Sequence, residues 1–161
     1  MRSLPIRALA TAMSGAAACT GANAGAMSGE PGLLITEIAA AGTPHDWVEV
    51  KNISERWLDL VDFVVVDARD DLDRARPLGA VKLAPGERYI RVLTDATVGF
   101  RLAGDEELWI YRAADGALVD GVDWDQGASP PGGSYARRGD TGMFVTRSEE
   151  HTSELQSPCN L

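Results

Sequence analysis

The carboxylates of this chain are the residues with the clearest chemical potential. Glu37 and Glu49 belong to two neighbouring segments in which apolar and polar residues alternate, a pattern typical of β-strands. Two carboxylates on adjacent strands could act as a general acid and a general base. The alternative is that each carboxylate binds backbone amides or a nearby Lys or Arg and holds a strand end in place.

Two clusters of aspartates could bind calcium, which takes oxygen ligands from short acidic loops. The first cluster lies in the charged segment 67–76 and consists of Asp67, Asp70, Asp71 and Asp73. No glycine stands where a tight calcium loop needs one, and arginines in the same segment offset the charge, so a solvated loop is the preferred interpretation. The second cluster consists of Asp120, Asp123 and Asp125, around Trp124. Alternation along a strand would send these side chains to different faces, which argues against a shared site.

Other catalytic signals are absent from the sequence. His45 is the only histidine before residue 147, it follows Pro44, and no Gly-x-Ser-x-Gly motif accompanies it. The sequence also lacks a His/Cys metal cluster, a phosphate-binding loop and a dinucleotide fingerprint. We therefore expect no catalytic residue, no metal and no cofactor, and we do not expect an enzyme.

Trp57 is the most interesting candidate for binding. It follows Ser54-Glu55-Arg56 in a predicted turn, where a large aromatic side chain could contact a protein or a glycan. Packing of the ring beneath the loop is the favoured alternative. Arg138-Gly139-Asp140 spells an adhesion tripeptide, which is interpreted as surface decoration.

Composition limits the class of partner. The net charge of -9 argues against a protein that follows nucleic-acid phosphates, because such binding needs a basic face. The hydrophobic fraction of 45% is ordinary for a globular domain. We expect no nucleic-acid partner.

The first residues are typical of an export signal, predicted for residues 1–24. A short positive region with Arg2 and Arg7 precedes an apolar run that is too short to span a bilayer, since spanning takes roughly 20 residues. Residues 16–19, Ala-Ala-Ala-Cys, are similar to a bacterial lipobox that would make Cys19 a lipidated N-terminus. Alternatively, cleavage after Ala22-Asn23-Ala24 would secrete the protein. Residues 25–32 would form a flexible linker, and membrane contact would depend on the lipid anchor alone.

Residues 147–161 do not continue the pattern before them. They resemble the translation of one frame of a widely used sequencing adapter, and we interpret them as an assembly artefact. We expect the natural sequence to continue differently after Thr146.

Between Leu33 and Val145 the hydrophobic period is two, and no segment has a long amphipathic helical pattern. Turn signals at Pro85-Gly86 and Asp115-Gly116 separate short alternating runs. About seven to nine short strands at this spacing predict an all-β sandwich for residues 33–146. The four tryptophans all fall inside this region and are expected to supply much of its core.

These segments together resemble the lamin tail domain, in the branch found in exported bacterial proteins. The resemblance depends on the order and spacing of several motifs rather than on any one of them. The principal motifs are Ile35-Thr36-Glu37-Ile38, Asp46-Trp47-Val48-Glu49-Val50-Lys51-Asn52, Leu58-Asp59-Leu60-Val61-Asp62-Phe63, Leu83-Ala84-Pro85-Gly86-Glu87, Gly104-Asp105-Glu106-Glu107-Leu108-Trp109-Ile110, Asp115-Gly116-Ala117-Leu118-Val119-Asp120 and Ser134-Tyr135-Ala136-Arg137-Arg138. Thr36 stands where the family commonly has Asn, and the family's closing Thr-Pro-Gly segment is missing.

The resemblance implies an immunoglobulin-like β-sandwich and assigns no catalysis to Glu37 or Glu49. We therefore expect a non-catalytic interaction or structural module of an exported (lipo)protein, at the outer membrane, periplasm or cell surface, or secreted. Its partner would be an unknown protein or glycan at the cell envelope. The alternative function is an N-terminal accessory domain of a secreted hydrolase of the nuclease or phosphatase type.

Overall fold

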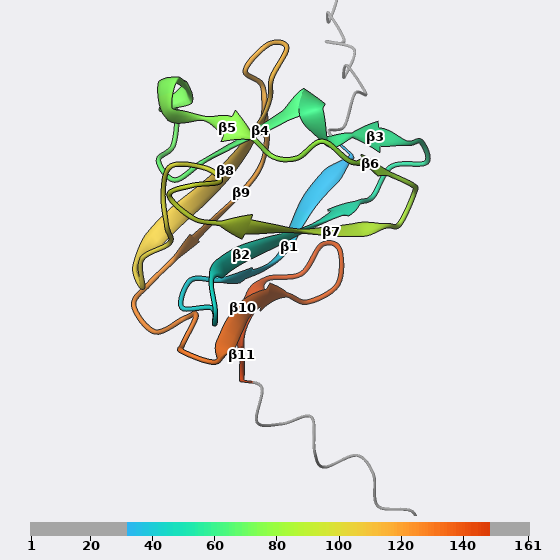
Figure 1. Ribbon diagram of the computed structural model, residues 1–161. Helices are drawn as coiled ribbons and strands as arrows, with labels where there is room; N and C mark the ends of the chain where they lie inside the picture. The colour runs from blue at the N-terminus through green and yellow to red at the C-terminus, as the bar shows by residue number, and fades with distance from the viewer. Residues whose placement is uncertain (1–31, 149–161) are drawn as a thin grey trace, which may run out of the picture.

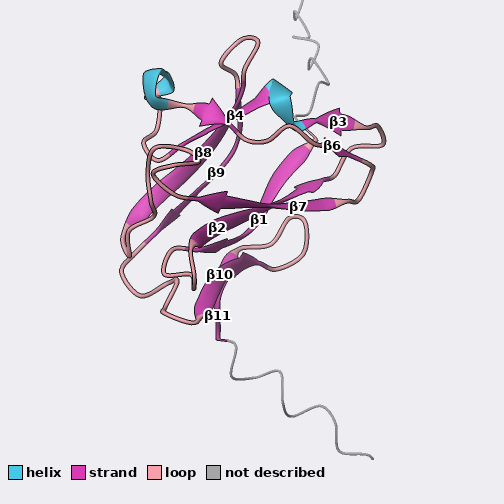
Figure 2. Cartoon of the chain, in the orientation of Figure 1, coloured by secondary structure: helices cyan, strands magenta, loops and turns pink. Residues whose placement is uncertain are grey.

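Residues 32–148, the part of the chain that the computed structural model describes, form antiparallel β-sheets with very little helix (Figures 1 and 2). This confirms the predicted all-β class. The strands are β1 (Leu33–Ala39), β2 (Asp46–Asn52), β3 (Leu58–Asp59), β4 (Phe63–Val66), β5 (Arg76–Pro77), β6 (Lys82–Leu83), β7 (Arg88–Leu93), β8 (Glu106–Arg112), β9 (Leu118–Trp124), β10 (Gly133–Arg137) and β11 (Phe144–Ser148). The two 3₁₀ turns are η1 (Leu60–Asp62) and η2 (Leu72–Arg74). Neither has the length of a membrane-crossing helix, and residues 32–148 contain no such helix.

The predictions for the N-terminus lie outside the described residues. They concern the signal peptide, Cys19 and all of the linker except Gly32. At the other end, β11 runs to Ser148, two residues past the predicted domain end at Thr146, because Arg147 and Ser148 pair with β10. The origin of residues 147–161 stays a prediction.

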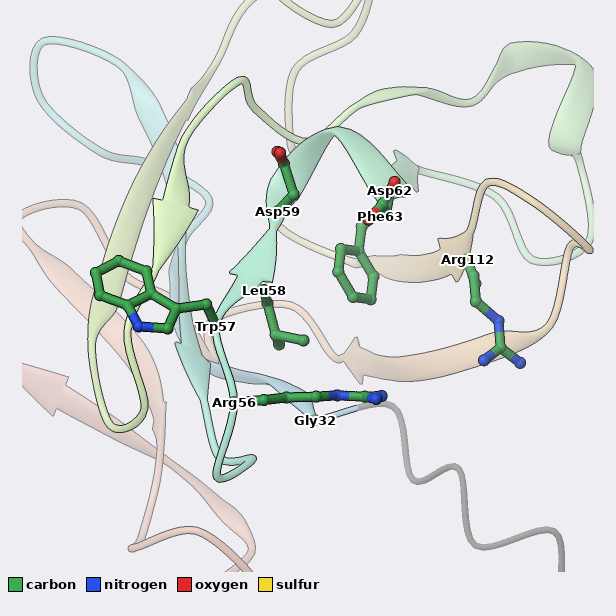
Figure 3. Close-up of a pocket in the computed structure, with 8 residues that line it drawn as sticks. All are labelled: Gly32, Arg56, Trp57, Leu58, Asp59, Asp62, Phe63 and Arg112. Carbon is green, nitrogen blue, oxygen red and sulfur yellow. The ribbon is translucent and has the colours of Figure 1, made fainter.

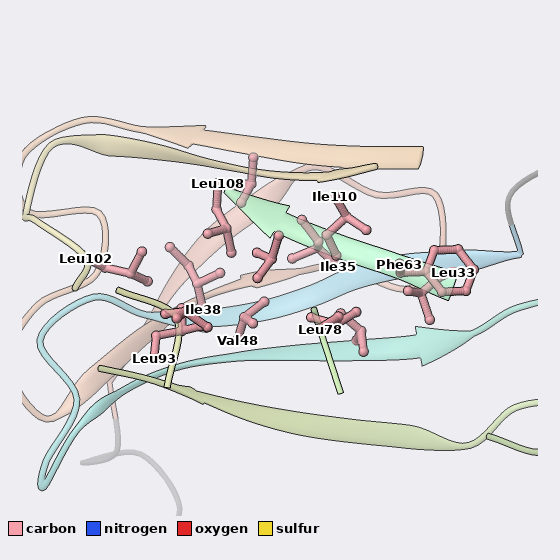
Figure 4. Close-up of a cluster of buried hydrophobic side chains, with 14 of the residues drawn as sticks. Leu33, Ile35, Ile38, Val48, Phe63, Leu78, Leu93, Leu102, Leu108 and Ile110 are labelled. Atoms are coloured by element: carbon pink, nitrogen blue, oxygen red, sulfur yellow. The ribbon is translucent and has the colours of Figure 1, made fainter. Parts of the chain in front are cut away.

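Two larger sheets contribute to one hydrophobic core (Figure 4). The five-stranded sheet has the order β11-β10-β1-β2-β7, the four-stranded sheet has the order β5-β4-β8-β9, and a small ladder joins β3 to β6. Alternation decides which residues face inward. In β2, Val48 and Val50 are fully buried, whereas Trp47 and Glu49 lie on the opposite face, in keeping with the period-two pattern of the segment.

The core is mainly aliphatic, so the prediction that four tryptophans supply much of it is wrong for three of them. Trp124 is buried and donates its indole N–H to the Ala103 carbonyl, over 3.1 Å. Trp47 and Trp109 are half-buried because the inward positions of their strands belong to aliphatic neighbours. Trp57 is 65% exposed.

A β-bulge at Thr36 changes the alternation predicted for β1. The register with β2 shifts between Ile35 and Glu37, so that Ile38 enters the core and Glu37 turns away from it. The Thr36 hydroxyl donates to the Glu49 carboxylate over 2.6 Å. A polar side chain thus occupies the irregular position and ties the bulge to β2.

The apolar run from Leu58 to Val66, whose pattern suits a strand buried on both sides or bent by a bulge, is interrupted by η1. The Asp59 carboxylate accepts a hydrogen bond from the Val61 amide at 3.3 Å and caps η1. The chain therefore leaves the β3–β6 ladder, turns once, and enters the four-stranded sheet as β4. Val61 is left 53% exposed, which a continuous buried strand would not allow.

Candidate functional site

Glu37 and Glu49 lie opposite each other on β1 and β2, but each carboxylate has its own cationic partner. Glu49 pairs with Arg88 and Glu37 pairs with Arg147, the second pair at 3.2 Å. Glu37 also accepts the Ser134 hydroxyl. Arg147 belongs to the predicted artefactual tail, but Thr36 and Arg88 at Glu49 and Ser134 at Glu37 precede it. These contacts support the structural interpretation of the two glutamates.

Two of the four aspartates of segment 67–76, Asp67 and Asp70, contact neighbouring side chains at hydrogen-bond distance. Asp67 pairs with Arg74 at 3.0 Å, and the Tyr111 hydroxyl donates to Asp70 over 3.2 Å. Within residues 32–148, no group of three or more His, Cys, Asp and Glu side chains is arranged to hold a metal ion.

The aspartates around Trp124 are separated, as alternation predicted. Asp120 forms an ion pair with Arg137 at 2.9 Å, whereas Asp123 and Asp125 are exposed. His45 is also exposed, in the connection between β1 and β2.

A cavity beside Trp57 is the candidate site that remains (Figure 3). It has a volume of about 330 Å³ and is lined by Gly32, Arg56, Trp57, Leu58, Asp59, Asp62, Phe63 and Arg112. A larger hollow of about 750 Å³ follows β10 and β11, but Arg147 and Ser148 line it and belong to the predicted artefactual tail. The cavity beside Trp57 is built only from residues before that tail.

Asn52, fully buried at the end of β2, organises the turn that presents this site. Its amide nitrogen donates to the carbonyls of Arg56 and Leu83, over 2.8 and 3.0 Å. Its amide oxygen accepts both the backbone N–H and the hydroxyl of Ser54. One buried side chain therefore holds the backbone from which Arg56 and Trp57 project.

The floor and the walls of the cavity differ in polarity. Phe63 and Leu58 are 6% and 8% exposed and form an apolar floor. Figure 3 shows the side chains of Arg56 and Arg112 on one side of this floor. The carboxylates of Asp59 and Asp62 lie on the other side in the same view, so the site has a cationic half and an anionic half.

Trp57 lies at the rim of the cavity rather than inside it. In Figure 3 its indole ring turns away from the two arginines. Its 65% exposure shows that the favoured sequence interpretation, packing beneath the loop, is wrong. Further exposed apolar side chains in the segments around it are Ile53, Val61 and Val81, at 39%, 53% and 41% exposure.

Sequence reasoning did not identify Arg56, Arg112 or Asn52 as parts of a site. The Asn52–Ser54 spacing is a signal for an Asx-type turn and could have suggested a role for Asn52. Arg112 could not have been found in this way, because only the pairing of β4 with β8 places it opposite Phe63.

Comparison of the chain with protein-family models, curated proteins and solved structures finds no match. The resemblance to the lamin tail domain therefore depends on the sequence motifs alone.

Proposed function

We propose that this chain is a non-catalytic interaction module of an exported protein, with an immunoglobulin-like, lamin-tail-like β-sandwich as its scaffold. Two observations support the scaffold: the ordered series of motifs in the sequence, and two antiparallel sheets that share one core. Such a scaffold presents loops and strand ends at fixed positions, which suits binding.

The exposure of Trp57 beside a cavity is the observation on which the function depends. Monomeric domains seldom leave a tryptophan 65% exposed, because burying its ring gives a large hydrophobic gain. Tryptophan and arginine are also the side chains that most often dominate binding energy at interfaces. Trp57, Arg56 and Arg112 all line this one cavity.

Site-specific photo-crosslinking tests the function. A photo-reactive aromatic residue at position 57 should give a discrete crosslinked product in the cell envelope. The same residue at Met143, which is 83% exposed on another loop, is the matched control and should not. Excess wild-type domain should compete for the product, and a Trp57→Ala domain should compete poorly. Identical products at both positions, or none at position 57, would contradict the proposal.

The proposed lipid anchor has a separate test. If Cys19 is lipidated, Cys19→Ser should move the protein from the membrane fraction to the soluble fraction. Unchanged fractionation would instead favour cleavage after Ala24 and secretion.

A further inference from the structure

We propose that the cavity beside Trp57 binds an acidic peptide segment of the partner, and that Arg56 and Arg112 receive its carboxylate. This inference rests on the proposed function, because it names the class of partner for the same site. Four features of the site support it: the position of Arg56, the contacts of Arg112, the placement of the aspartates, and the apolar floor.

Arg56 is held in place at its backbone, and its side chain has no partner among residues 32–148. Its carbonyl accepts hydrogen bonds from Asn52 and Ser54, at 2.8 and 3.1 Å. Its guanidinium forms no hydrogen bond and no ion pair with any residue in the range 32–148. The turn therefore fixes the backbone position of Arg56, and the N–H donors of its guanidinium can bind a ligand.

Arg112 is only partly neutralised. Its Nε donates to the Asp115 carboxylate over 2.9 Å, a hydrogen bond that lowers the pKa of Asp115 and keeps that side chain ionised. The terminal nitrogens of Arg112 form no hydrogen bond with any described residue. Cross-strand pairing places Arg112 opposite Phe63, so its position beside the apolar floor is fixed by the sheet.

The two aspartates of the cavity do not neutralise this cationic half. Asp59 accepts the Val61 amide and lies 3.9 Å from Lys82. In Figure 3 the carboxylates of Asp59 and Asp62 project on the far side of Phe63 from both arginines. A ligand can therefore reach Arg56 and the terminal nitrogens of Arg112 from the side of the floor opposite to Asp59 and Asp62.

The chemistry of the site favours a peptide. Guanidinium groups bind carboxylates through two parallel hydrogen bonds, which gives both energy and direction. A nucleic acid would need a longer track of cations than two arginines provide. Phe63 and Leu58 would accept an apolar side chain next to the acidic one, and Trp57 would contact the peptide at the rim. The favoured ligand is thus an extended segment in which Glu or Asp alternates with apolar residues.

The test is a titration followed by NMR on the whole chain labelled with ¹⁵N. The probe is the blocked peptide acetyl-Leu-Glu-Leu-Glu-Leu-amide, and its Gln counterpart is the matched control. The acidic peptide should shift the Nε–H signals of Arg56 and Arg112 and the indole signal of Trp57, with saturation. The Gln peptide should bind at least about tenfold more weakly than the acidic peptide, because its side-chain amides carry no charge for the arginines to bind.

Variants locate the binding. Arg56→Met and Arg112→Met keep most of the side-chain volume, and each should weaken binding about tenfold or more. Arg88→Met is the control, since Arg88 already pairs with Glu49 on the five-stranded sheet. Dispersed amide spectra verify that each variant is folded.

Four outcomes would overturn the inference: equal binding of the two peptides, equal loss in Arg88→Met, acetate alone giving the same shifts, or no shift at all. A change of the Arg56 and Arg112 signals in Glu30→Gln, without peptide, would identify the chain's own Glu30 as the occupant and would also overturn it. Crosslinking at position 57 that persists in any of these cases would leave the proposed function standing.

Discussion

Arg137 and Asp120 connect the two large sheets at the backbone of Ile35. Arg137 lies on β10 of one sheet and Asp120 on β9 of the other, and their side chains pair at 2.9 Å. Asp120 also accepts the Ile35 amide over 2.8 Å, and Arg137 donates to the Ile35 carbonyl over 2.9 Å. β10 pairs only with Glu37 and Ile38 of β1, so these side chains satisfy backbone groups that the ladder does not reach.

Asp120→Ala should therefore destabilise the domain by about 2–4 kcal/mol, because it leaves the Ile35 amide and one terminal nitrogen of Arg137 without their carboxylate acceptor. The two side chains are 17% and 15% exposed, so the loss should fall short of that for a fully buried pair. Urea denaturation measures the effect. Asp123→Ala, exposed on the same strand, is the matched control and should stay within about 0.5 kcal/mol of wild type. A loss below about 1 kcal/mol for Asp120→Ala would show that the contact is dispensable.

Asn52→Asp should destabilise the domain by about 2–4 kcal/mol at neutral pH. The substitution keeps the shape of the side chain but replaces the donor that faces the carbonyls of Arg56 and Leu83 with a carboxylate oxygen. The carbonyl oxygens of Arg56 and Leu83 would then face a carboxylate oxygen, which cannot donate a hydrogen bond to them. Thermal unfolding measures the stability, and exchange of the Ser54 amide measures the order of the turn. Ser54→Ala removes bonds at the outer side of the same turn and should cost less. Equal effects of the two variants would show that Asn52 is not the centre of the turn.

Much of the fold could be predicted from local sequence because its causes are local. The period-two alternation gave β2 its buried and exposed faces, and the Asp115-Gly116 turn lies between β8 and β9, with Gly116 at a φ of 67°. A positive φ favours glycine at that position, so this turn can be predicted from the residue type alone. The Pro85-Gly86 turn follows the same rule, with Gly86 at a φ of 79°.

The features that escaped prediction depend on partners distant in sequence. The bulge at Thr36 is tied to Glu49, a residue of the next strand, and nothing in the local pattern marks it. The exposure of Trp57 could not be decided either, since a tryptophan in a turn can pack or project with the same neighbours in sequence. The cationic half of the site needed both the turn at Asn52 and the pairing of β4 with β8.

Trp57→Ala and Trp124→Ala should separate binding from stability. Trp124 is 2% exposed and its indole N–H donates to Ala103, so its removal should cost about 3–5 kcal/mol. Trp57 is 65% exposed, so its removal should change the free energy of unfolding by about 0.5 kcal/mol or less. Chemical denaturation of both variants measures the difference. A loss above about 1.5 kcal/mol for Trp57→Ala would mean that the ring packs on the domain and is not displayed for a partner.

The difference in unfolding free energy between Glu106→Gln and wild type should increase in favour of the variant as the pH rises. Burial raises the pKa of Glu106 above its ordinary value, the Ala103 amide opposes this by donating to the carboxylate over 2.6 Å, and the nearby charges of Asp67 and Asp46 raise it further. A raised pKa means that the folded state holds the proton more tightly than the unfolded state. The unfolding free energy contributed by Glu106 is therefore complete at low pH and is lost as the pH rises through the interval between the two pKa values.

Gln keeps the acceptor for the Ala103 amide and has no charge to bury, so it avoids that loss. We expect the stability difference between Glu106→Gln and wild type to be small near pH 4 and to increase in favour of the variant toward pH 7. Urea denaturation of both proteins across this range measures the difference, and titration of the Glu106 carboxyl carbon by NMR measures its pKa directly. A difference that is constant with pH, or that favours wild type more strongly at pH 7, would contradict the raised pKa. Loss of the variant's stability at every pH would instead mean that the Ala103 contact needs the carboxylate.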